Sequence, residues 1–330
     1  MSKTYLTVRL SSLGDVLLTT GVMAYWHKIR RYRFIMLTRA GFADLFRGHP
    51  AVERVIPVQQ NDLSLMQWWD LCHILKKKYQ SMEIIDLHGN LRTMLLKHIW
   101  PQQTHTYAKL SFYRRLFALT GIKIAGKKLL QNNIPQRYAT ALESFPPDPS
   151  ETTPRIYLSN TELLQAEQTL KNVSGTEGVI AIHPYATHET KTWPRQNWKT
   201  LTSSLDQAKI PWIIIGRSLN PLYPGDMRDL TNKTDIRQAA SIIKKCSALV
   251  TADSGPMHIG SSTGTPVIAL FGPTSREWGF YPCGPDDVVL EKKLPCRPCS
   301  LHGRSKIKCG VKCMENIQTE EVMIAIKRIL

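Results

Sequence analysis

The stretch ALVTADSGP at positions 248–256 places a carboxylate at the end of a short apolar run. The run Ala248–Ala252 lacks polar alternation, which predicts a buried strand of a parallel sheet. Asp253 follows it directly, and Pro256 can open a helix because the N–H that proline lacks is not used in a first turn. Ligands of open α/β sheets bind at the carboxyl ends of the strands. We therefore expect Asp253 to face a ligand.

The same arrangement recurs where Thr265-Pro266 leads into the apolar run Val267–Phe271 and then into Gly272-Pro273-Thr274. Two small-residue loops at neighbouring strand ends offer backbone N–H groups and hydroxyls to phosphates or sugar hydroxyls. His258 lies one helical turn beyond Asp253. Either loop alone is more typical of an ordinary strand-to-helix turn, but the two together favour a ligand site.

A lysine, Lys191, precedes a Trp-Pro pair after the apolar run Gly178–His183, which predicts another strand. Its ammonium is a compact positive charge of the kind that can neutralise a phosphate group. One lysine before Trp-Pro is weak evidence by itself.

Near the N-terminus, Tyr5–Leu10 predicts a strand, and the polar loop SSLGD at positions 11–15 follows it. A carboxylate near a helix N-terminus is stabilised by exposed N–H groups, so Asp15 can simply cap the next helix. The same position at a strand end suits a general base. The motif G-x-G-x-x-G is absent, which argues against a dinucleotide site.

A further polar loop, DLHGNLR at positions 86–92, follows the predicted strand Met82–Asp86. The planar guanidinium of Arg92 matches a carboxylate or phosphate bidentately, and Asn90 can support it. Arg92 is equally compatible with a plain surface position on the next helix.

Four motifs, in this order, resemble glycosyltransferase family 9, the bacterial heptosyltransferases of lipopolysaccharide core assembly: RLSSLGDV (9–16), DLHGNLR (86–92), K-x-W-P (191–194) and DSGPMH with GTPVIALFGPT (253–274). The resemblance implies an α/β fold of the GT-B type, with two Rossmann-like doubly wound domains facing across a cleft. It also implies inverting transfer of heptose from ADP-heptose to the Kdo-lipid A inner core of lipopolysaccharide.

In that resemblance Asp15 is the base that activates the acceptor hydroxyl, and Lys191 with Thr187 binds the departing ADP. Asp253 orients the donor sugar, and no cofactor is required for catalysis. The implied donor-binding residues are Thr187, Lys191, Asp253, Ser254, Gly255, Met257, His258, Gly272 and Thr274. The implied acceptor-binding residues are Ser12, Asn90 and Arg92.

One loop departs from the family pattern. Relatives usually carry an acidic residue shortly after the strand that ends at Gly216-Arg217, whereas this chain has SLNP at positions 218–221. A family 9 enzyme with another sugar nucleotide, or with a glycan or protein acceptor, therefore stays open.

Two cysteine pairs, Cys296 with Cys299 and Cys309 with Cys313, could give four thiolates to a structural zinc or iron ion, and His302 is an alternative ligand. In a chain without an apparent signal peptide, such cysteines favour thiols or metal over disulfides. A metal-stapled interaction module is the corresponding alternative function.

The elements that carry these residues suit two domains. The proline-rich stretch FPPDPSETTP at positions 145–154 predicts a linker between an acceptor-binding domain, 1–154, and a sugar-nucleotide-binding domain, 155–330. The amphipathic helix 319–330 crosses back to the first domain in the family fold.

The charge is uneven. The formal net charge is +17, and residues 1–150 contribute +12 of it, from 21 Lys/Arg and 9 Asp/Glu. Such a surface attracts nucleic acid, an anionic membrane or a phosphorylated substrate, or it merely keeps the protein soluble. No nucleic-acid-binding motif is recognisable. We expect a cytoplasmic protein, peripheral to the inner membrane, that meets an anionic lipid A core acceptor and binds no nucleic acid.

Overall fold

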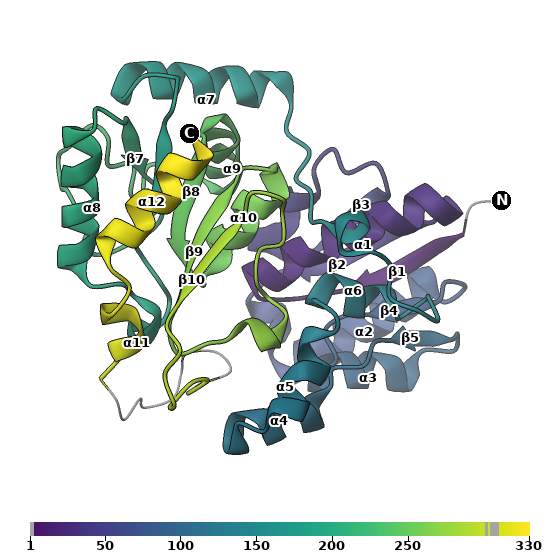
Figure 1. The fold of residues 1–330 in the computed structure, drawn as a ribbon. Coiled ribbons are helices and arrows are strands. Elements are labelled where there is room, and N and C mark those ends of the chain that lie inside the picture. Colours follow the sequence, from purple (N-terminus) through teal and green to yellow (C-terminus); the bar gives the residue numbers. More distant parts are fainter. Residues whose placement is uncertain (1–2, 301–302, 304–309) are drawn as a thin grey trace. The chain divides into compact units, whose positions relative to one another are not determined.

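The computed structural model describes residues 3–300, 303 and 310–330, and the chain divides into two compact units (Figure 1). The first unit contains Met1–Lys109 and Ile134–Tyr157, and the second contains Leu110–Asn133 and Leu158–Leu330. Each unit is built on one five-stranded parallel sheet. The predicted α/β class with two parallel sheets is therefore confirmed.

The sheet of the first unit has the strand order β3-β2-β1-β4-β5. Its strands are β1 Thr4–Val8, β2 Arg33–Arg39, β3 Val52–Val58, β4 Ile84–Asp86 and β5 Thr104–Thr106. Its α-helices are α1 Leu13–Arg30, α2 Leu65–Tyr79, α3 Leu91–Ile99 and α6 Ile134–Ala139. Short 3₁₀ segments are η1 Ala40–Phe46, η2 Asn61–Leu63 and η3 Pro149–Thr152.

Alternate residues of β2 serve the two faces of this sheet, as the two-residue period of a strand requires. Ile35 and Leu37 pack into the cluster formed with α2 and α3, whereas Phe34 contacts Trp26 of α1. Both faces are thus covered, which explains why the strand is a continuous apolar run.

The return of the chain to the first unit depends on one glycine. A Cβ at Gly21 of α1 would lie 2.2 Å from the carbonyl oxygen of Thr152 in η3, so only glycine permits this approach. The backbone N–H of Arg155 donates to the Thr20 hydroxyl at 2.8 Å. The predicted linker region is therefore packed against α1.

The sheet of the second unit has the order β10-β9-β8-β6-β7. Its strands are β6 Ile180–His183, β7 Trp212–Ile214, β8 Ala248–Ala252, β9 Val267–Phe271 and β10 Val288–Glu291. Its α-helices are α4 Ser111–Thr120, α5 Lys123–Leu130, α7 Asn160–Val173, α8 Arg195–Gln207, α9 Ile236–Lys245, α10 Gly255–Thr263, α11 Lys312–Glu315 and α12 Thr319–Ile329. Two 3₁₀ segments are η4 Glu189–Lys191 and η5 Arg276–Trp278.

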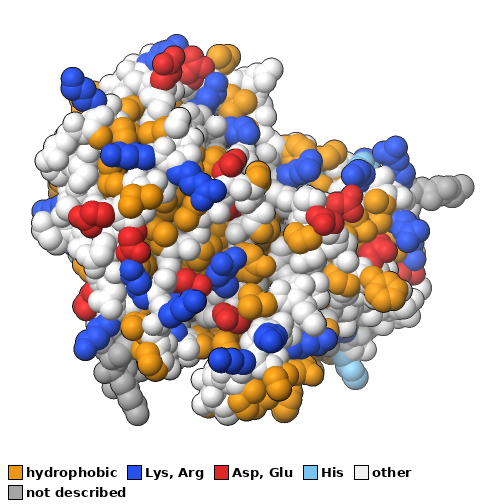
Figure 2. Space-filling view, viewed as in Figure 1, with side chains coloured by type: hydrophobic (Ala, Val, Ile, Leu, Met, Phe, Trp, Pro, Cys, Tyr) orange, Lys and Arg blue, Asp and Glu red, His pale blue; other side chains and the backbone are white. Residues whose placement is uncertain are grey.

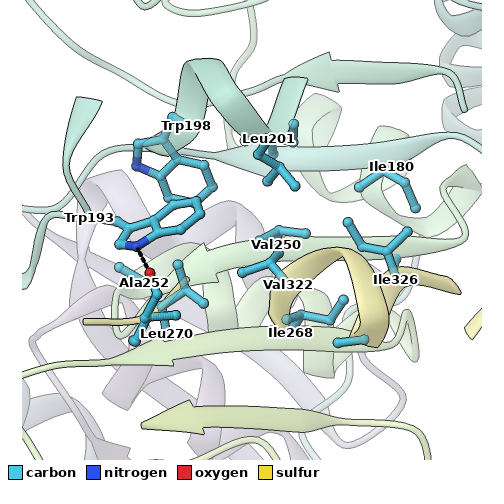
Figure 3. Close-up of a cluster of buried hydrophobic side chains, with 14 of the residues drawn as sticks. Ile180, Trp193, Trp198, Leu201, Val250, Ala252, Ile268, Leu270, Val322 and Ile326 are labelled. Atoms are coloured by element: carbon cyan, nitrogen blue, oxygen red, sulfur yellow. Dashed lines mark hydrogen bonds between the residues drawn. The ribbon is translucent and has the colours of Figure 1, made fainter. Parts of the chain in front are cut away.

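The main core of this unit lies between the sheet, α8 and α12 (Figure 3). Trp193 and Trp198 meet edge to face with ring centroids 4.9 Å apart, and the Trp193 indole N–H donates to the Ile317 carbonyl at 2.9 Å. Val322 and Ile326 of α12 join the same core. The predicted crossing of the last helix to the first unit stays a prediction.

The segment of residues 110–133 belongs to the second unit although it lies in the first half of the chain. Phe117 and Leu129 of α4 and α5 pack on Trp278 of η5. No feature of the sequence analysis predicts this excursion, because the contact joins side chains far apart along the chain. None of the helices within the described residues is long and apolar enough to span a membrane.

Candidate active site

The predicted site residues follow the strands at which the strand order reverses. In the first sheet the reversal lies between β1 and β4, and in the second it lies between β6 and β8. Asp15 follows β1 and Asn90 follows β4, while Lys191 follows β6 and Asp253 follows β8. Doubly wound sheets bind ligands outside the carboxyl ends of the strands at such reversals. Each unit thus has one candidate cluster.

The cluster of the first unit is centred on Asp15. Its Oδ2 accepts the backbone N–H of Ser12 at 3.2 Å and the Ser12 hydroxyl at 2.8 Å. Its Oδ1 lies 2.6 Å from Arg9 Nη2 and accepts the Tyr138 hydroxyl at 3.4 Å. These contacts use the positions at which a carboxylate ordinarily accepts hydrogen bonds. Asp15 therefore does cap α1, the structural role that its sequence position allows.

Asp15 is an anion at neutral pH in this setting. Burial by itself would raise the pKa of the carboxyl, but the positive charge of Arg9 and the hydrogen bonds from Ser12 hold that pKa below its ordinary value. The side chain stays 16% exposed. An ionised, partly accessible carboxylate is a competent proton acceptor.

The loop after β4 is closed by its own contacts. Asp86 Oδ1 accepts the backbone N–H groups of His88 and Gly89 at 2.9 and 2.7 Å, and Asn90 caps α3 through the N–H of Thr93. The Arg92 guanidinium donates from Nε and Nη2 to the Leu63 carbonyl, at 3.0 and 2.7 Å. Asn90 and Arg92 thus have structural partners, and their acceptor-binding roles stay predictions.

The cluster of the second unit is centred on an ion pair. Lys191 Nζ, at the end of η4, donates to Asp253 Oδ2 at 2.7 Å and to the Asp253 carbonyl at 3.2 Å. Both side chains are mostly buried, with 15% and 12% exposed. The structure therefore brings together two of the residues predicted from separate motifs.

Thr274 and His258 also influence the Asp253 carboxyl. Burial favours a higher pKa for its carboxyl, but Lys191, the Thr274 hydroxyl and His258 lower that pKa below its ordinary value. The Thr274 hydroxyl is buried near the Asp253 carboxyl and makes no other hydrogen bond among the described residues. The predicted residues Thr274 and His258 therefore lie in the same cluster as the ion pair.

The helix α10 begins immediately beyond Asp253. Ser254 is its N-cap, but the Ser254 side chain caps no N–H of the helix. In the first turn, Pro256 has no N–H and the Met257 N–H donates to the Ser254 carbonyl at 3.2 Å, so the Gly255 N–H is the first-turn donor suited to an anion. Met257 points elsewhere, because its side chain is fully buried against Phe271 of β9. Thr187 lies exposed in the loop after β6.

Sequence reasoning missed Arg297, which anchors the loop after β9. Its Nε donates to the Gly272 carbonyl at 2.6 Å, and its Nη2 donates to the Thr274 carbonyl at 2.9 Å. Gly272 itself is required by packing, since a Cβ there would lie 2.4 Å from the Met314 sulfur. The planar guanidinium of arginine can donate to both carbonyls at once, and only the tertiary fold brings it to this loop.

Gly303 supports the lysine. A Cβ at Gly303 would lie 2.9 Å from Lys191 Cε, and the Gly303 φ of +81° is a conformation that glycine adopts without strain. The Thr190 hydroxyl donates to the Gly303 carbonyl at 2.6 Å. The sequence gives no signal for this contact, because it joins the loop after β6 to a segment more than 100 residues further along the chain.

The predicted metal site is only partly described. Cys309 and His302 lie outside the described residues. Cys313 is fully buried in the main core, whereas Cys296 is exposed, and Cys299 donates its thiol to the Cys296 carbonyl at 2.9 Å. Among the described residues, no three His, Cys, Asp or Glu side chains form a group that could hold a metal ion. These cysteines do not by themselves fit a metal centre, and the zinc or iron site stays a prediction.

Comparison with known proteins shows which family the chain around these clusters resembles. A family model described as glycosyltransferase family 9 (heptosyltransferase) matches residues 72–308. Lipopolysaccharide heptosyltransferase 1 of Pseudomonas aeruginosa is 26% identical over 322 residues, covering 89% of this chain and 85% of the relative.

Two solved structures share the fold. A family 9 glycosyltransferase of Veillonella parvula aligns with a TM-score of 0.78 at 19% identity, covering 99% of this chain and 97% of that one. The E. coli heptosyltransferase WaaC, solved with ADP, aligns with a TM-score of 0.66 at 19% identity, covering 99% and 100%. The predicted GT-B fold class is thereby confirmed.

Proposed function

The chain belongs to glycosyltransferase family 9, and we propose that it transfers heptose from ADP-heptose to the Kdo-lipid A inner core of lipopolysaccharide with inversion at the anomeric carbon. The observation that carries the proposal is the Lys191–Asp253 pair, placed at the strand-order reversal and directly before the start of α10. The named relative, a lipopolysaccharide heptosyltransferase, and the structure solved with ADP support this choice of substrates.

The donor side must accept the charge that develops on ADP. As the bond between the anomeric carbon and the phosphate oxygen breaks, negative charge grows on the diphosphate. Lys191 uses two of its three N–H groups on Asp253, so one remains for a phosphate oxygen. The Gly255 N–H at the start of α10 supplies a further donor. Asp253 holds the ammonium in place and can accept hydrogen bonds from sugar hydroxyls.

The acceptor side must take one proton. The acceptor oxygen attacks the anomeric carbon on the face opposite the leaving phosphate, and its proton passes to Asp15. A carboxylate whose pKa is lowered by Arg9 is a weak base towards a free hydroxyl. The hydroxyl becomes strongly acidic only once its bond to carbon is largely formed, so proton transfer to Asp15 is late.

The transfer step needs no cofactor in this proposal. Lys191 and the positive N-terminal end of α10, with the Gly255 N–H, supply the positive charge that a metal ion supplies in other transferases. Any ion at the cysteines would be structural and would hold the segment that carries Arg297 and Gly303. We propose that the enzyme acts at the cytoplasmic face of the inner membrane, where its lipid acceptor lies.

A second donor or acceptor has one observation in its favour. The loop after β7, residues 218–221, is the one that differs from the family pattern. Its conformation is held by contacts within the chain, because Ser218 and Asn232 exchange hydrogen bonds of 3.1 and 2.7 Å. Leu219 is 99% exposed at its tip. Another sugar nucleotide, or a glycan or protein acceptor, is therefore the alternative within the family.

A turnover assay tests the proposal. Purified protein is incubated with ADP-heptose and a Kdo-containing lipid A, and the product is read by mass spectrometry. A gain of one heptose, lost in Asp15→Asn, supports donor, acceptor and base together. No gain with ADP-heptose, but transfer from another sugar nucleotide, would overturn the heptose assignment and keep the family. Tight, salt-sensitive RNA or DNA binding that is unchanged in Asp15→Asn, without transfer, would favour a nucleic-acid-binding protein.

A further inference from the structure

The helices α4 and α5 form a two-helix hairpin, residues 111–130, whose outer face is apolar and cationic. On α4, Phe112 and Leu119 are 72% and 85% exposed, and Arg115 lies between them on the same helical stripe. On α5, Ile124 is 78% exposed and shares its stripe with the two lysines that follow three and four residues later. The space-filling view shows apolar and cationic side chains together over these helices (Figure 2).

The inner face of the hairpin is a packed core. Phe117 meets Trp278 edge to face with ring centroids 5.7 Å apart, and Leu129 is fully buried in the same cluster. A Cβ at Gly126 would lie 2.9 Å from the Phe117 ring, so the two helices approach closely at this glycine. The hairpin is therefore held rigidly on η5, and its exposed apolar side chains are not needed for its core.

The charge of the hairpin has one sign. Between Asp86 and Glu143 the sequence contains no acidic residue. Five cations lie within the hairpin: Arg114, Arg115, Lys123, Lys127 and Lys128. Apart from Arg114, all are exposed, and no carboxylate of the described residues forms an ion pair with these four. Their field is therefore not neutralised within the second unit.

We propose that the hairpin docks on an anionic lipid bilayer, with Phe112, Leu119 and Ile124 inserted between lipids and the cations against phosphate headgroups. Exposed apolar side chains interleaved with cations are typical of interfacial membrane helices. A nucleic acid would satisfy the cations but would leave three large apolar side chains in water. The bilayer is the partner whose chemistry matches both.

The location of the hairpin suggests what membrane docking would achieve, and this step rests on the proposed function. The hairpin packs on η5, and η5 begins two residues after Thr274 of the donor-side cluster. A bilayer that held the hairpin would hold the donor-side cluster close to the surface in which a lipid acceptor lies. Membrane binding itself needs neither substrate, so it can be tested apart from transfer.

The test is co-sedimentation of the full chain with phosphatidylethanolamine/phosphatidylglycerol vesicles, compared with phosphatidylcholine vesicles. Lys127→Glu/Lys128→Glu should weaken binding about thirtyfold or more, since each cation near an anionic surface contributes about 1 kcal/mol and each new carboxylate is repelled by that surface. Phe112→Ser/Leu119→Ser/Ile124→Ser should weaken it about tenfold or more through lost apolar insertion. Circular dichroism verifies that both variants stay folded.

Two matched controls distinguish an effect of the hairpin from a general effect of net charge or of exposed apolar side chains. Lys199→Glu/Lys327→Glu makes the same change in net charge at exposed positions of α8 and α12. Leu65→Ser/Met66→Ser/Ile74→Ser removes three side chains that are 63–77% exposed on α2, which also carries the exposed Asp70, Lys77 and Lys78 and is therefore the competing surface that this control tests. Both controls should bind the anionic vesicles as the unmodified chain does.

Hydrogen exchange locates the contact. Amides of residues 111–130 should exchange more slowly on the anionic vesicles, and high salt should release the charge-dependent part. Protection confined to α2, equal loss in the controls, or no vesicle binding would overturn the proposal. So would tight binding of RNA through the same hairpin without vesicle binding. Vesicle binding without heptose transfer would leave the docking surface standing and count against the proposed reaction alone.

Discussion

Asp15 in the first unit and Asp253 in the second lie at equivalent places. Each follows a parallel strand at a strand-order reversal, and each stands beside the first turn of a helix. Each carboxylate pairs with a cation, Arg9 at 2.6 Å and Lys191 at 2.7 Å. The pKa of each is lowered by that cation against the opposing effect of burial.

The cations differ in what they have left to donate. Arg9 donates from Nη1 to the Leu87 carbonyl at 2.5 Å and from Nη2 to Asp15, and its buried Nε has no hydrogen-bond partner among the described residues. Lys191 keeps one N–H without a partner in the part of the chain that the structure describes. Arg9 is therefore a fixed charge that keeps Asp15 ionised. Lys191 is suited to bind a ligand anion, so similar local arrangements serve different chemistry.

The largest effect is expected from Asp15→Asn. Loss of the proton acceptor should lower kcat by about 10²–10⁴, the usual contribution of a positioned general base. Asparagine keeps an oxygen for the Ser12 N–H, so α1 should remain capped. Single-turnover transfer, read by mass spectrometry, measures the effect.

Glu162→Gln is the matched control for that change. Glu162 makes the same capping contact with the N–H of Ser159, at 2.8 Å, and pairs with Arg237 at 2.5 Å, but it lies on α7 away from both strand-order reversals. It should lose stability and keep kcat. Equal losses of kcat in the two variants would mean that Asp15 matters only as a helix cap.

Lys191→Met tests the second cluster. Removing the cation should lower kcat by about 10²–10³, the usual cost of losing one preorganised donor to a developing anion. Lys292→Met is the control, since Lys292 pairs with Glu321 at 2.7 Å in the same unit. A variant that kept kcat and lost only affinity for the acceptor would contradict the leaving-group role.

A third prediction concerns stability, with one histidine in each unit. Burial lowers the pKa of His49 and of His183 to about 4, from an ordinary 6.5. As pH falls from 6.5 towards 4, the unfolded chain takes up protons that the folded chain refuses, so stability falls in that window. Each histidine can remove up to about 3 kcal/mol.

Urea unfolding at neutral pH and near pH 4 measures this loss. His49→Gln and His183→Gln should each flatten the pH dependence, whatever they do to stability at neutral pH, because glutamine does not ionise. Carboxyls with lowered pKa, such as those of Asp15, Asp253 and Glu162, also begin to lose their stabilising effect near pH 4, so the comparison with each glutamine variant isolates the histidine contribution. An unchanged slope in both variants would show that these histidines are not held neutral.

The strands that position the sites were readable from the sequence. Ala248–Ala252 and Val267–Phe271 are strands with the predicted bounds, because strands buried on both faces are continuous apolar runs ended by Gly, Pro or Asp. The loops after them followed directly. The ion pair of Lys191 with Asp253 was not predicted, since no local pattern joins residues so far apart; the family resemblance implied only that both residues bind the donor.

The supporting residues could not be found in this way. Arg297 anchors two carbonyls, and Gly303 backs Lys191, through contacts between loops that only the tertiary fold brings together. The hairpin of residues 111–130 lies in the first half of the sequence but packs on Trp278 of the second unit, and that packing leaves no local trace in the sequence. Local patterns report strands and caps, and they do not report tertiary partners.

The smallest effect is expected from Tyr138→Phe, which removes the longest contact of Asp15, at 3.4 Å, and keeps the buried ring. Losing one long hydrogen bond to the carboxylate should change kcat about threefold or less and move the acid limb of kcat/KM slightly upward, because the ionised carboxylate loses one donor. Tyr223→Phe, whose hydroxyl pairs with Thr202 at 2.7 Å in the second unit, should leave that limb in place. A loss of kcat as large as that of Asp15→Asn would instead mean that Tyr138 takes part in the proton transfer, so that the first cluster would act through two residues and not through Asp15 alone.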